Sequence, residues 1–496
     1  MNQYILSIDA GTTSSRALIF DKSGNEIAKS QNEFKQYFPK EGWVEHDPLE
    51  IWSSQKEALQ NVLKAQTIST HEIMGIGITN QRETTIVWNK ETGKPIYNAI
   101  VWQDRRTSEF CAELKSKGYE PLVNSKTGLL LDPYFSGTKI NWILENIAGA
   151  RQKAKEGKLL FGTVDTWLIW NLSGGKKHIT DPSNASRTML FDIHKNCWDA
   201  ELLALLDIPE NMLPQIVESA SNEAEAQLEG WERPIPIYAI AGDQQAALFG
   251  QLCFSPGDVK NTYGTGCFCM MHTGKTPVIS NNKMLTTIAW QMNGEVEYAL
   301  EGSVFIGGAL IQWLRDGIEL IKNASDIEAL ATSVNDNGGV TFIPALTGLG
   351  APYWDANATG GIMGLTRGTK KGHIARAALE AIAIRSMEII VEMQKDSGIQ
   401  FTNLKVDGGA CKNNLLMQIQ ADLLNTKVIR PKTTETTALG IAFMAGLSCG
   451  FWKNKDTIKK LWEEEKTFDP VTSDTNSALI ALWNSRIQKI LSSESR

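Results

Sequence analysis

The sequence predicts an α/β protein of two domains, whose mixed sheets are flanked by helices and enclose a ligand cleft between them. Three observations carry this prediction. The chain has 496 residues, and roughly 150 residues per domain argues for more than one core. Apolar strand-like runs alternate with helical patterns. The second half also repeats the strand, glycine turn and strand that open the first. We expect domains over residues 1–250 and 251–496.

Composition excludes several classes of protein and partner. Lys plus Arg is 49 and Asp plus Glu is 56, so 49 − 56 gives a net charge of −7. A mildly acidic chain lacks the basic surface that binds nucleic acid or an anionic membrane. The sequence has no run of about 18 apolar residues, the length that would indicate a membrane-spanning helix. The seven cysteines form no CxxC pair, which is typical of reduced thiols. With no leader-like N-terminus, we expect a cytoplasmic protein without integral membrane association.

The elements of the first half follow from its hydrophobic pattern. Two apolar runs, 4–9 and 16–21, predict strands joined by a turn rich in Gly and hydroxyl side chains. Apolar residues recur at helical spacing over 47–65, which predicts an amphipathic helix. The continuous apolar run 73–79 predicts a strand buried on both faces.

The second half shows the same alternation. Residues 234–243 predict a strand that runs directly into a helix, and 259–271 predict a strand, a glycine turn and a second strand. A long helix is expected over 373–398, ending at a glycine of the C-cap type. Residues 404–409 predict a strand that ends in a Gly pair, and 437–450 a helix of small residues suited to close packing.

The familiar phosphate-binding loops are absent. The nearest match to a Walker A loop ends in Gly274-Lys275-Thr276, but the position of its first glycine is occupied by Cys269. No G-x-G-x-x-G segment follows a strand, which excludes a Rossmann dinucleotide site.

The turn between the first two strands has the chemistry of an anion site. Residues 9–16, DAGTTSSR, bring a carboxylate, a glycine and four hydroxyls together. Backbone N–H groups in such a turn form an anion nest, to which hydroxyls add donors. An Asp at a strand end can hold Mg²⁺ directly or through water. An ordinary polar hairpin with an Asp cap explains this segment equally well.

Two more turns of this kind lie in the second half. They are TYGTG at 262–266 and DGG at 407–409, where glycine permits close approach of a ligand. Each turn alone is weak evidence. Three such turns, each after an apolar strand and spread over both halves, indicate two lobes that clamp a nucleotide.

Longer motifs resemble a known family. YFSGTKINWILEN at 134–146 and the stretch 360–380 are similar to the two signatures of the FGGY carbohydrate kinases, which share the ribonuclease H-like fold of actin and hexokinase. Within that family, GWVEHDP at 42–48, GITNQRETTIVW at 77–88 and AGDQQAALFGQ at 241–251 resemble the glycerol kinases. The resemblance runs from residue 4 to about 455.

The resemblance implies a polyol site. The positions matching those that contact glycerol are Arg82, Glu83, Tyr134 and Asp243, with Gln244 beside them and Trp102 and Phe268 packed against its carbons. Arg82 offers a fork of donors and Glu83 accepts from hydroxyls. Because adjacent strand residues point to opposite faces, we place this pair in the turn after strand 73–79. For the pair alone a surface ion pair is the alternative, and for the two aromatic residues ordinary core packing is.

Asp243 is the candidate catalytic base. It follows a strand and precedes a helix, so local sequence alone favours a helix N-cap. The family resemblance implies instead that its carboxylate accepts the proton of the attacking hydroxyl.

The resemblance also implies a nucleotide site and a metal site. Its positions are Thr12, Thr13, Ser14 and Arg16 at the phosphates, with Thr265, Gly308, Gln312, Gly409 and Asn413 from the second half. Asp9 and Asp243 are the implied contacts of Mg²⁺, through water. Packing between helices is the alternative role for the glycine pair at 307–308, and capping of its own turn is the alternative for Asn413.

The resemblance implies the ATP-dependent phosphorylation of glycerol, with Mg²⁺ as cofactor and ADP as product. It also implies that the protein is a homo-oligomer, either a dimer or a tetramer. A kinase for another polyol or a ketose is the near alternative. A non-catalytic ATP-dependent scaffold and a catalytically silent glycerol sensor are the distant ones. The sequence departs from the family at Ala10, where bacterial relatives often carry Gln, and in segment 226–236, AQLEGWERPIP, which lacks a regulatory glycine run. No histidine occurs over 195–271. We therefore expect no inhibition by fructose-1,6-bisphosphate and no control by a phosphohistidine carrier.

Overall fold

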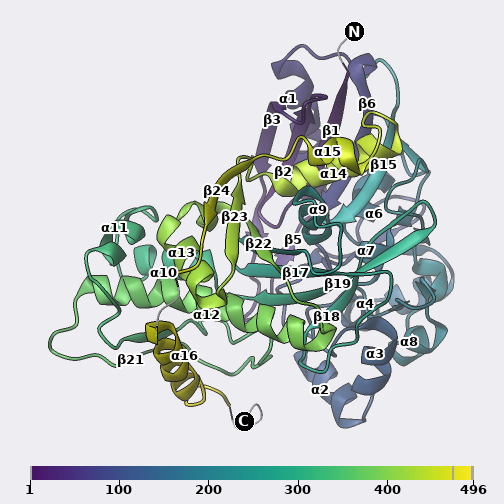
Figure 1. Cartoon of the computed structure of the whole chain (residues 1–496). Coiled ribbons are helices and arrows are strands. Elements are labelled where there is room, and N and C mark those ends of the chain that lie inside the picture. Colours follow the sequence, from purple (N-terminus) through teal and green to yellow (C-terminus); the bar gives the residue numbers. More distant parts are fainter. Residues whose placement is uncertain (1–2, 472–473, 493–496) are drawn as a thin grey trace.

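Two large mixed sheets organise the protein (Figure 1). The computed structural model describes residues 3–471 and 474–492. Across the first sheet the strands are β14 (Ala224–Ala226), β15 (Ile235–Gly242), β6 (Ile73–Asn80), β1 (Tyr4–Ala10), β2 (Ser14–Phe20) and β3 (Glu26–Glu33). β15, β6 and β1 are parallel, and the other pairs are antiparallel. The predicted mixed sheet is therefore confirmed.

Helices cover both faces of the first sheet. Leu6 and Ile8 of β1 pack in one core cluster with Ile51 and Leu59 of α1 (Pro48–Ala65), whereas Ile5 packs in another cluster with α14 (Thr436–Ser448). This division follows from the strand period, because successive side chains point to opposite faces. Asp47 caps α1 by accepting the N–H of Leu49. The predicted helix over 47–65 is thus confirmed almost to the residue.

The second sheet comes entirely from later residues. Its strands, in order, are β18 (Leu285–Met292), β19 (Glu295–Val304), β17 (Cys267–Gly274), β16 (Val259–Tyr263), β22 (Asn403–Asp407), β23 (Lys427–Pro431) and β24 (Glu464–Phe468). The helices around it are α10 (Gly308–Asp316), α11 (Asp326–Thr332), α12 (Lys371–Ser397) and α13 (Asn414–Leu424). α12 ends at Gly398, whose φ of 67° is the left-handed C-cap that the sequence predicts.

Smaller elements surround the sheets. The remaining helices are α2 (Ser108–Ser116), α3 (Glu120–Thr127), α4 (Ser136–Asn146), α5 (Ala150–Lys155), α6 (Val164–Leu172), α7 (Pro182–Ala185), α8 (Ala200–Leu205), α9 (Asp243–Gly250), α15 (Lys455–Lys459) and α16 (Asp474–Ile487). The short strands are β4 (Gln36–Tyr37), β5 (Glu45–His46), β7 (Ile86–Asn89), β8 (Ala99–Ile100), β9 (Leu159–Gly162), β10 (Ile179–Thr180), β11 (Phe191–Asp192), β12 (Cys197–Trp198), β13 (Gln215–Ile216), β20 (Thr341–Ile343) and β21 (Gly361–Met363).

The two halves of the chain are interleaved. In Figure 1, α14, in yellow-green, lies beside the purple strands β1 and β2 and the teal strand β15, although it comes from the late part of the chain. α14 also packs on α9, and Gly440 lies so close to the carbonyl oxygen of Ala246 that a Cβ there would be 1.8 Å from it. Small residues at this contact let the two backbones touch, as the composition of 437–450 predicts.

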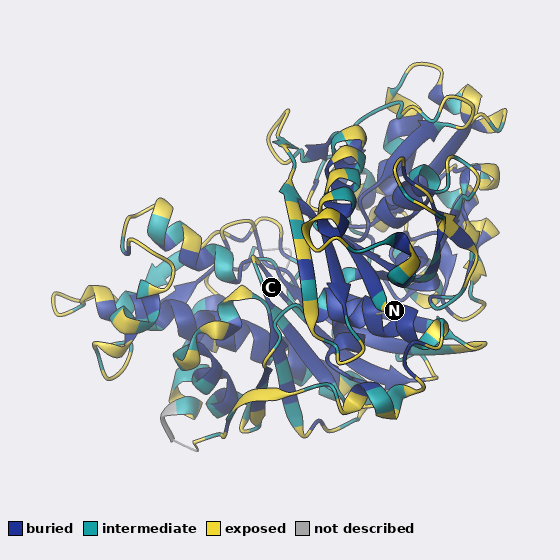
Figure 2. Cartoon of the chain, turned by 90° about the horizontal axis from the view of Figure 1, so that it is seen from above, coloured by how far each residue is buried: buried dark blue, intermediate teal, exposed yellow. Residues whose placement is uncertain are grey.

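Burial follows the layers. In Figure 2 the strands are mostly dark blue, while yellow residues gather on loops and on outward helix faces. Within the described residues, no helix combines the length and apolar character needed to cross a bilayer.

Candidate active site

The predicted site residues of the first turn, of Arg82 and Glu83, and of Asp243 lie where three parallel strands end. β1, β6 and β15 end at Ala10, Asn80 and Gly242, and parallel strands place these ends at one edge of the sheet. The N–H of Gln81 donates to the carbonyl oxygen of Ala10 at 2.8 Å, which joins the first turn to the second.

Glu83 turns the chain sharply after β6. Its φ is 60°, an unusual value for a side chain of this size. Ser136 and Thr85 both donate their hydroxyls to the carbonyl oxygen of Glu83, at 2.9 and 3.1 Å. The turn expected for the pair Arg82 and Glu83 is therefore present. Both side chains are buried, which removes the alternative of a surface ion pair.

Asp243 is the first residue of α9, and Gly242 occupies the N-cap position. The carboxylate accepts the backbone N–H of Gln244 at 2.7 Å, and its side chain keeps 29% exposure. The Nε of Arg82 lies 3.3 Å from Oδ1 of Asp243. Burial raises the pKa of Asp243 to about 6, against the opposing charge of Arg82. The expected N-cap role thus belongs to the neighbouring glycine, and the carboxylate faces the site.

Three aromatic side chains form a wall beside Arg82, Glu83 and Asp243. The ring of Trp102 lies 5.7 Å from that of Tyr134 and 6.0 Å from that of Phe268, measured between centroids, and both contacts are edge-on. Trp102 follows β8, Tyr134 precedes α4 and Phe268 is on β17, so residues from both halves of the chain contribute. Such a wall can pack against the carbon face of a small polyol.

Charged and polar partners that the sequence analysis missed complete the group. Lys260 is buried and donates to Oε1 of Gln244 at 2.5 Å and to the hydroxyl of Thr262 at 2.8 Å. Glu301 binds Arg82, and Arg187 binds Glu83. Lys260 and Glu301 lie in strands without a motif of their own. Arg187 lies in NASRTMLF (184–191), a stretch that resembles the same kinases, but the resemblance did not single it out as a site residue.

The first hairpin turn is shorter than predicted. Ser14 already belongs to β2, because Ala10 pairs with Ser15 in the ladder. Only residues 11–13 form the turn, which the N–H of Gly11 closes on the carbonyl oxygen of Ser14 at 2.9 Å. Thr13 is exposed at its tip and Ser14 is buried. The guanidinium of Arg16 lies between the carboxylates of Asp9 and Glu435, and Nη1 is 2.6 Å from the latter.

The second hairpin borders a cavity of about 500 Å³. Five of the residues expected at a nucleotide line it, namely Thr265, Gly308, Gln312, Gly409 and Asn413. The glycine pair at 307–308 docks on the hairpin, since the N–H of Gly308 donates to the carbonyl oxygen of Gly264 at 2.8 Å. Asn413 caps α13 through the N–H of Leu416, as its alternative role predicts, and it also lines the cavity.

The donor set fits a metal held largely by water. In the part of the chain that the structure describes, no group of three or more His, Cys, Asp or Glu side chains forms a metal cage. The carboxylate of Asp9 is close enough that its charge contributes to raising the pKa of Asp243. Mg²⁺ commonly uses one or two carboxylates, waters and phosphate oxygens. Asp9 and Asp243 match that requirement.

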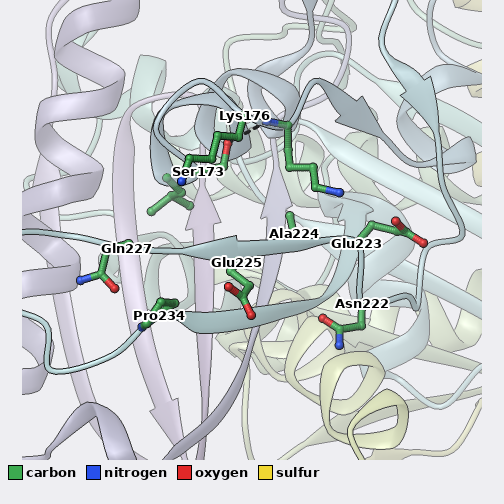
Figure 3. Close-up of a pocket in the computed structure, with 10 residues that line it drawn as sticks. Ser173, Lys176, Asn222, Glu223, Ala224, Glu225, Gln227 and Pro234 are labelled. Atoms are coloured by element: carbon green, nitrogen blue, oxygen red, sulfur yellow. Dashed lines mark hydrogen bonds between the residues drawn. The ribbon is translucent and has the colours of Figure 1, made fainter.

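A second hollow lies away from this site. Figure 3 shows it between the turn after α6 and strand β14, with Lys176, Glu223 and Glu225 around it. Its volume is about 460 Å³. Lys176 and Lys177 line the side of the turn, and Glu223 and Glu225 line the side of β14, so the formal charges of the wall sum to zero. Gln227 and Pro234, in the segment that lacks a glycine run, also line it.

Comparisons with known proteins agree with this architecture. The model of the N-terminal domain of the FGGY family of carbohydrate kinases matches residues 4–250, and that of the C-terminal domain matches residues 259–449. Glycerol kinase 2 of Thermotoga maritima is 56% identical over all of both chains. A glycerol kinase of Clostridium botulinum is 55% identical, again over all of both.

Solved structures extend the likeness to the backbone. Plasmodium falciparum glycerol kinase with ADP is 36% identical, with a TM-score of 0.92 over 99% of each chain. A xylulose kinase from Lactobacillus acidophilus, 23% identical over 98% of this chain and 97% of its own, has a TM-score of 0.87 and shares the fold. Two family models matched in order along one chain, and relatives more than half identical from end to end, leave one conclusion, that this chain belongs to the FGGY family of carbohydrate kinases.

Proposed function

We propose that this protein transfers the γ-phosphoryl group of ATP to glycerol, giving sn-glycerol 3-phosphate and ADP. The observation that carries the proposal is the buried turn of Arg82 and Glu83 beside Asp243, faced by the aromatic wall of Trp102, Tyr134 and Phe268. Full-length relatives named as glycerol kinases support the choice of substrate.

The geometry suits a small triol. Arg82 supplies N–H donors and Glu83 supplies acceptor oxygens from adjacent positions, so two neighbouring hydroxyls can be held at once. Gln244, fixed by Lys260, adds a side-chain amide at the same place. The aromatic wall then covers the carbon face and limits the space for a longer sugar. These contacts position the remaining primary hydroxyl toward Asp243.

Asp243 acts as general base in this proposal. A primary alcohol is a poor nucleophile, and its proton leaves as the bond to phosphorus forms. A pKa of about 6 keeps the carboxylate ionised at neutral pH, yet more basic than an exposed Asp. Transfer is direct and in line, and positioning together with charge neutralisation supplies most of the rate. No side chain becomes phosphorylated.

The nucleotide is placed between the two halves. In this assignment the cavity beside Gly409 and Gln312 takes the adenosine, and the turns at 11–13 and 264–266 hold the phosphates from opposite sides. Mg²⁺, held through water by Asp9 and Asp243, would neutralise charge on the phosphate oxygens. We assign the first phosphate turn to a domain of residues 1–250 and the adenosine cavity to residues 251–496.

The test is a coupled assay of ADP release with and without glycerol. We expect ADP release that depends on glycerol and equals the amount of glycerol 3-phosphate formed. A panel with xylulose, ribitol and dihydroxyacetone measures selectivity, and glycerol should have the highest kcat/KM. A higher kcat/KM for any other polyol or ketose would refute the choice of substrate. ADP release that is independent of every polyol would refute transfer to a small molecule altogether.

A further inference from the structure

A single carboxylate from the second sheet holds the polyol site of the first half together. Glu301 is on β19, and none of its side chain is exposed. Its two oxygens accept from Nη1 and Nη2 of Arg82 at 2.5 and 2.9 Å. Oε1 also accepts from Nη2 of Arg187 at 2.9 Å. One carboxylate therefore binds two buried arginines that lie more than 100 positions away in the chain.

Arg187 extends these contacts to Glu83, the second residue of the proposed polyol pair. Nε of Arg187 donates to Oε1 of Glu83 at 2.6 Å. The guanidinium of Arg187 also lies over the ring of Tyr134, 5.5 Å from its centroid. Arg82, Glu83 and Tyr134 are thus each fixed by Glu301 directly or through Arg187.

These bonds leave the Nε–H of Arg82 directed toward Asp243. Nη1 and Nη2 bind Glu301, and Nη1 also has Oε1 of Gln245 at 3.2 Å. Nε remains on the other side, 3.3 Å from Oδ1 of Asp243. A guanidinium is a rigid planar fork, so fixing two of its nitrogens fixes the direction of the third.

The charges of this cluster of four side chains balance, which lets all four stay ionised although they are buried. Two guanidiniums and two carboxylates, Arg82, Arg187, Glu83 and Glu301, are buried together and sum to zero. Burial alone would raise the pKa of Glu301, but Arg187 and Arg82 lower it to about 2, so this carboxylate stays ionised. Replacing a buried ion pair with apolar residues is often neutral or stabilising, whereas a lone buried charge is costly. Stability alone is therefore a weak reason for four charges here.

The Nη1 atom of Arg187 supports the same conclusion. It is buried without a hydrogen-bond partner among the described residues. A group selected for stability would be expected to satisfy each of its donors. The orientation of Arg187 instead serves Glu83, Glu301 and the ring of Tyr134.

We propose that Glu301 is a positioning residue of the polyol site, which sets Arg82 directly and Glu83 through Arg187, so that the second half of the chain completes a binding site carried by the first. This inference rests on the proposed function only for the identity of the polyol. Glu301 itself does not touch the substrate in this proposal.

The experiment compares Glu301→Gln with the parent enzyme. Gln keeps the shape but removes the charge that binds both guanidiniums. Hydrogen bonds to charged groups contribute about 1.5–3 kcal/mol, so KM for glycerol should rise roughly 10- to 100-fold. KM for ATP should change by less than about twofold, because the adenosine cavity does not include this group. Glu380→Gln is the matched control, since it also removes a buried carboxylate from an arginine pair, with Arg376 on α12, outside the polyol site.

The outcomes separate the alternatives. A glycerol KM that stays within twofold of the parent, or KM values for glycerol and ATP that rise equally, would overturn the positioning role. Should the Gln variant not fold, Glu301→Asp is measured instead, because it keeps the charge but withdraws the carboxylate by one methylene, and the same KM split is expected. Turnover of glycerol by the parent tests the proposed function independently. Were the parent to use another polyol, the split would be measured on that polyol.

Discussion

Trp102 donates its indole N–H to the hydroxyl oxygen of Thr12 at 3.0 Å. This bond joins the aromatic wall of the proposed polyol site to the turn at 11–13, which we propose holds phosphate. Because Thr12 accepts from the indole, its own O–H is left to donate elsewhere. In the proposed assignment, this O–H donates to a phosphate oxygen.

Trp102→Phe tests this link. Phe keeps an aromatic face for the polyol, although its ring is smaller than indole, and it lacks the N–H donor. A typical hydrogen bond contributes about 0.5–1.5 kcal/mol, so KM for ATP should rise roughly 2- to 10-fold with little change in KM for glycerol. A double-mutant cycle with Thr12→Val should show that the two effects are not additive. Additive effects would mean that the bond does not contribute to nucleotide binding.

Asp243→Asn tests the general base. Asn keeps the size and removes the proton acceptor, so kcat should fall about 10²- to 10⁴-fold. The loss will be smaller if the transition state is loose and the hydroxyl loses its proton late. Thermal stability should not fall, because Gly242 and not Asp243 occupies the N-cap position of α9. A folded variant that turns over at the parental rate would rule this residue out as base.

The pH dependence of the parent follows from the same carboxyl group. Its pKa is raised to about 6 in the folded protein, and a base must be unprotonated to act. The kcat/KM for glycerol should therefore fall as pH decreases through about 6, with unit slope. The effect of pH on folding stability has the opposite sign to its effect on activity. A raised pKa means that the folded state binds this proton more tightly than the unfolded state, so the ionised carboxylate disfavours folding above pH 6. At pH 8, the Tm of the Asn variant should thus equal or exceed that of the parent.

Lys139 supports the loop that carries Tyr134. It is buried and donates to the carbonyl oxygens of Pro133, Tyr134 and Phe135, the last two at 2.9 and 3.2 Å. Lys139→Met should leave these carbonyls without their charged donor and lower the free energy of unfolding by roughly 1.5–3 kcal/mol. Urea unfolding measures the loss. Lys153→Met, on the exposed side of α5, is the control and should change stability little. Equal stabilities for the two variants would contradict the role of Lys139.

The sequence predicted the layers better than it predicted the connections among them. β1, β6, β15 and α1 are apolar runs of clear period, and the structure has them within a residue or two. Arg82, Glu83 and Asp243 lie in recognisable motifs. Glu301 was missed because its partners are distant in the chain and a lone Glu within a strand has no local signature. Arg187 lies in the recognised stretch 184–191, but only the fold shows that its partners are Glu83 and Glu301. The interleaving of α14 with the first sheet was missed for the same reason.

The segment 226–236 gives a prediction about control. Arg233 donates through Nη2 to the carbonyl oxygen of Ile73 at 2.7 Å, so this arginine is engaged by the start of β6. The nearby hollow of Figure 3 is lined by two Lys and two Glu side chains, so it lacks the excess of positive charge that would hold a doubly phosphorylated sugar. Addition of fructose-1,6-bisphosphate should leave the rate of glycerol phosphorylation unchanged. Saturable inhibition that disappears in Arg233→Ala would show instead that this segment binds the bisphosphate.

α14, from the C-terminal half, packs on α9, the helix that carries the proposed base. α9 begins at Asp243, and α14 packs on it through glycines. A Cβ at Gly440 would lie 1.8 Å from the carbonyl oxygen of Ala246, which is backbone and cannot rotate away. Gly440→Ala must therefore separate the two helices.

Overpacking of this kind costs typically about 1–3 kcal/mol, and a backbone clash belongs at the upper end. We expect Tm to fall by several degrees and kcat to fall with it, because any shift of α9 moves Asp243 relative to Arg82, now 3.3 Å away. Gly368→Ala is the control, since the nearest atom to a Cβ there is 3.7 Å away. If the Gly440 variant lost stability but kept full kcat at a temperature where it is folded, the packing would serve stability alone, and α14 would have no part in placing the base.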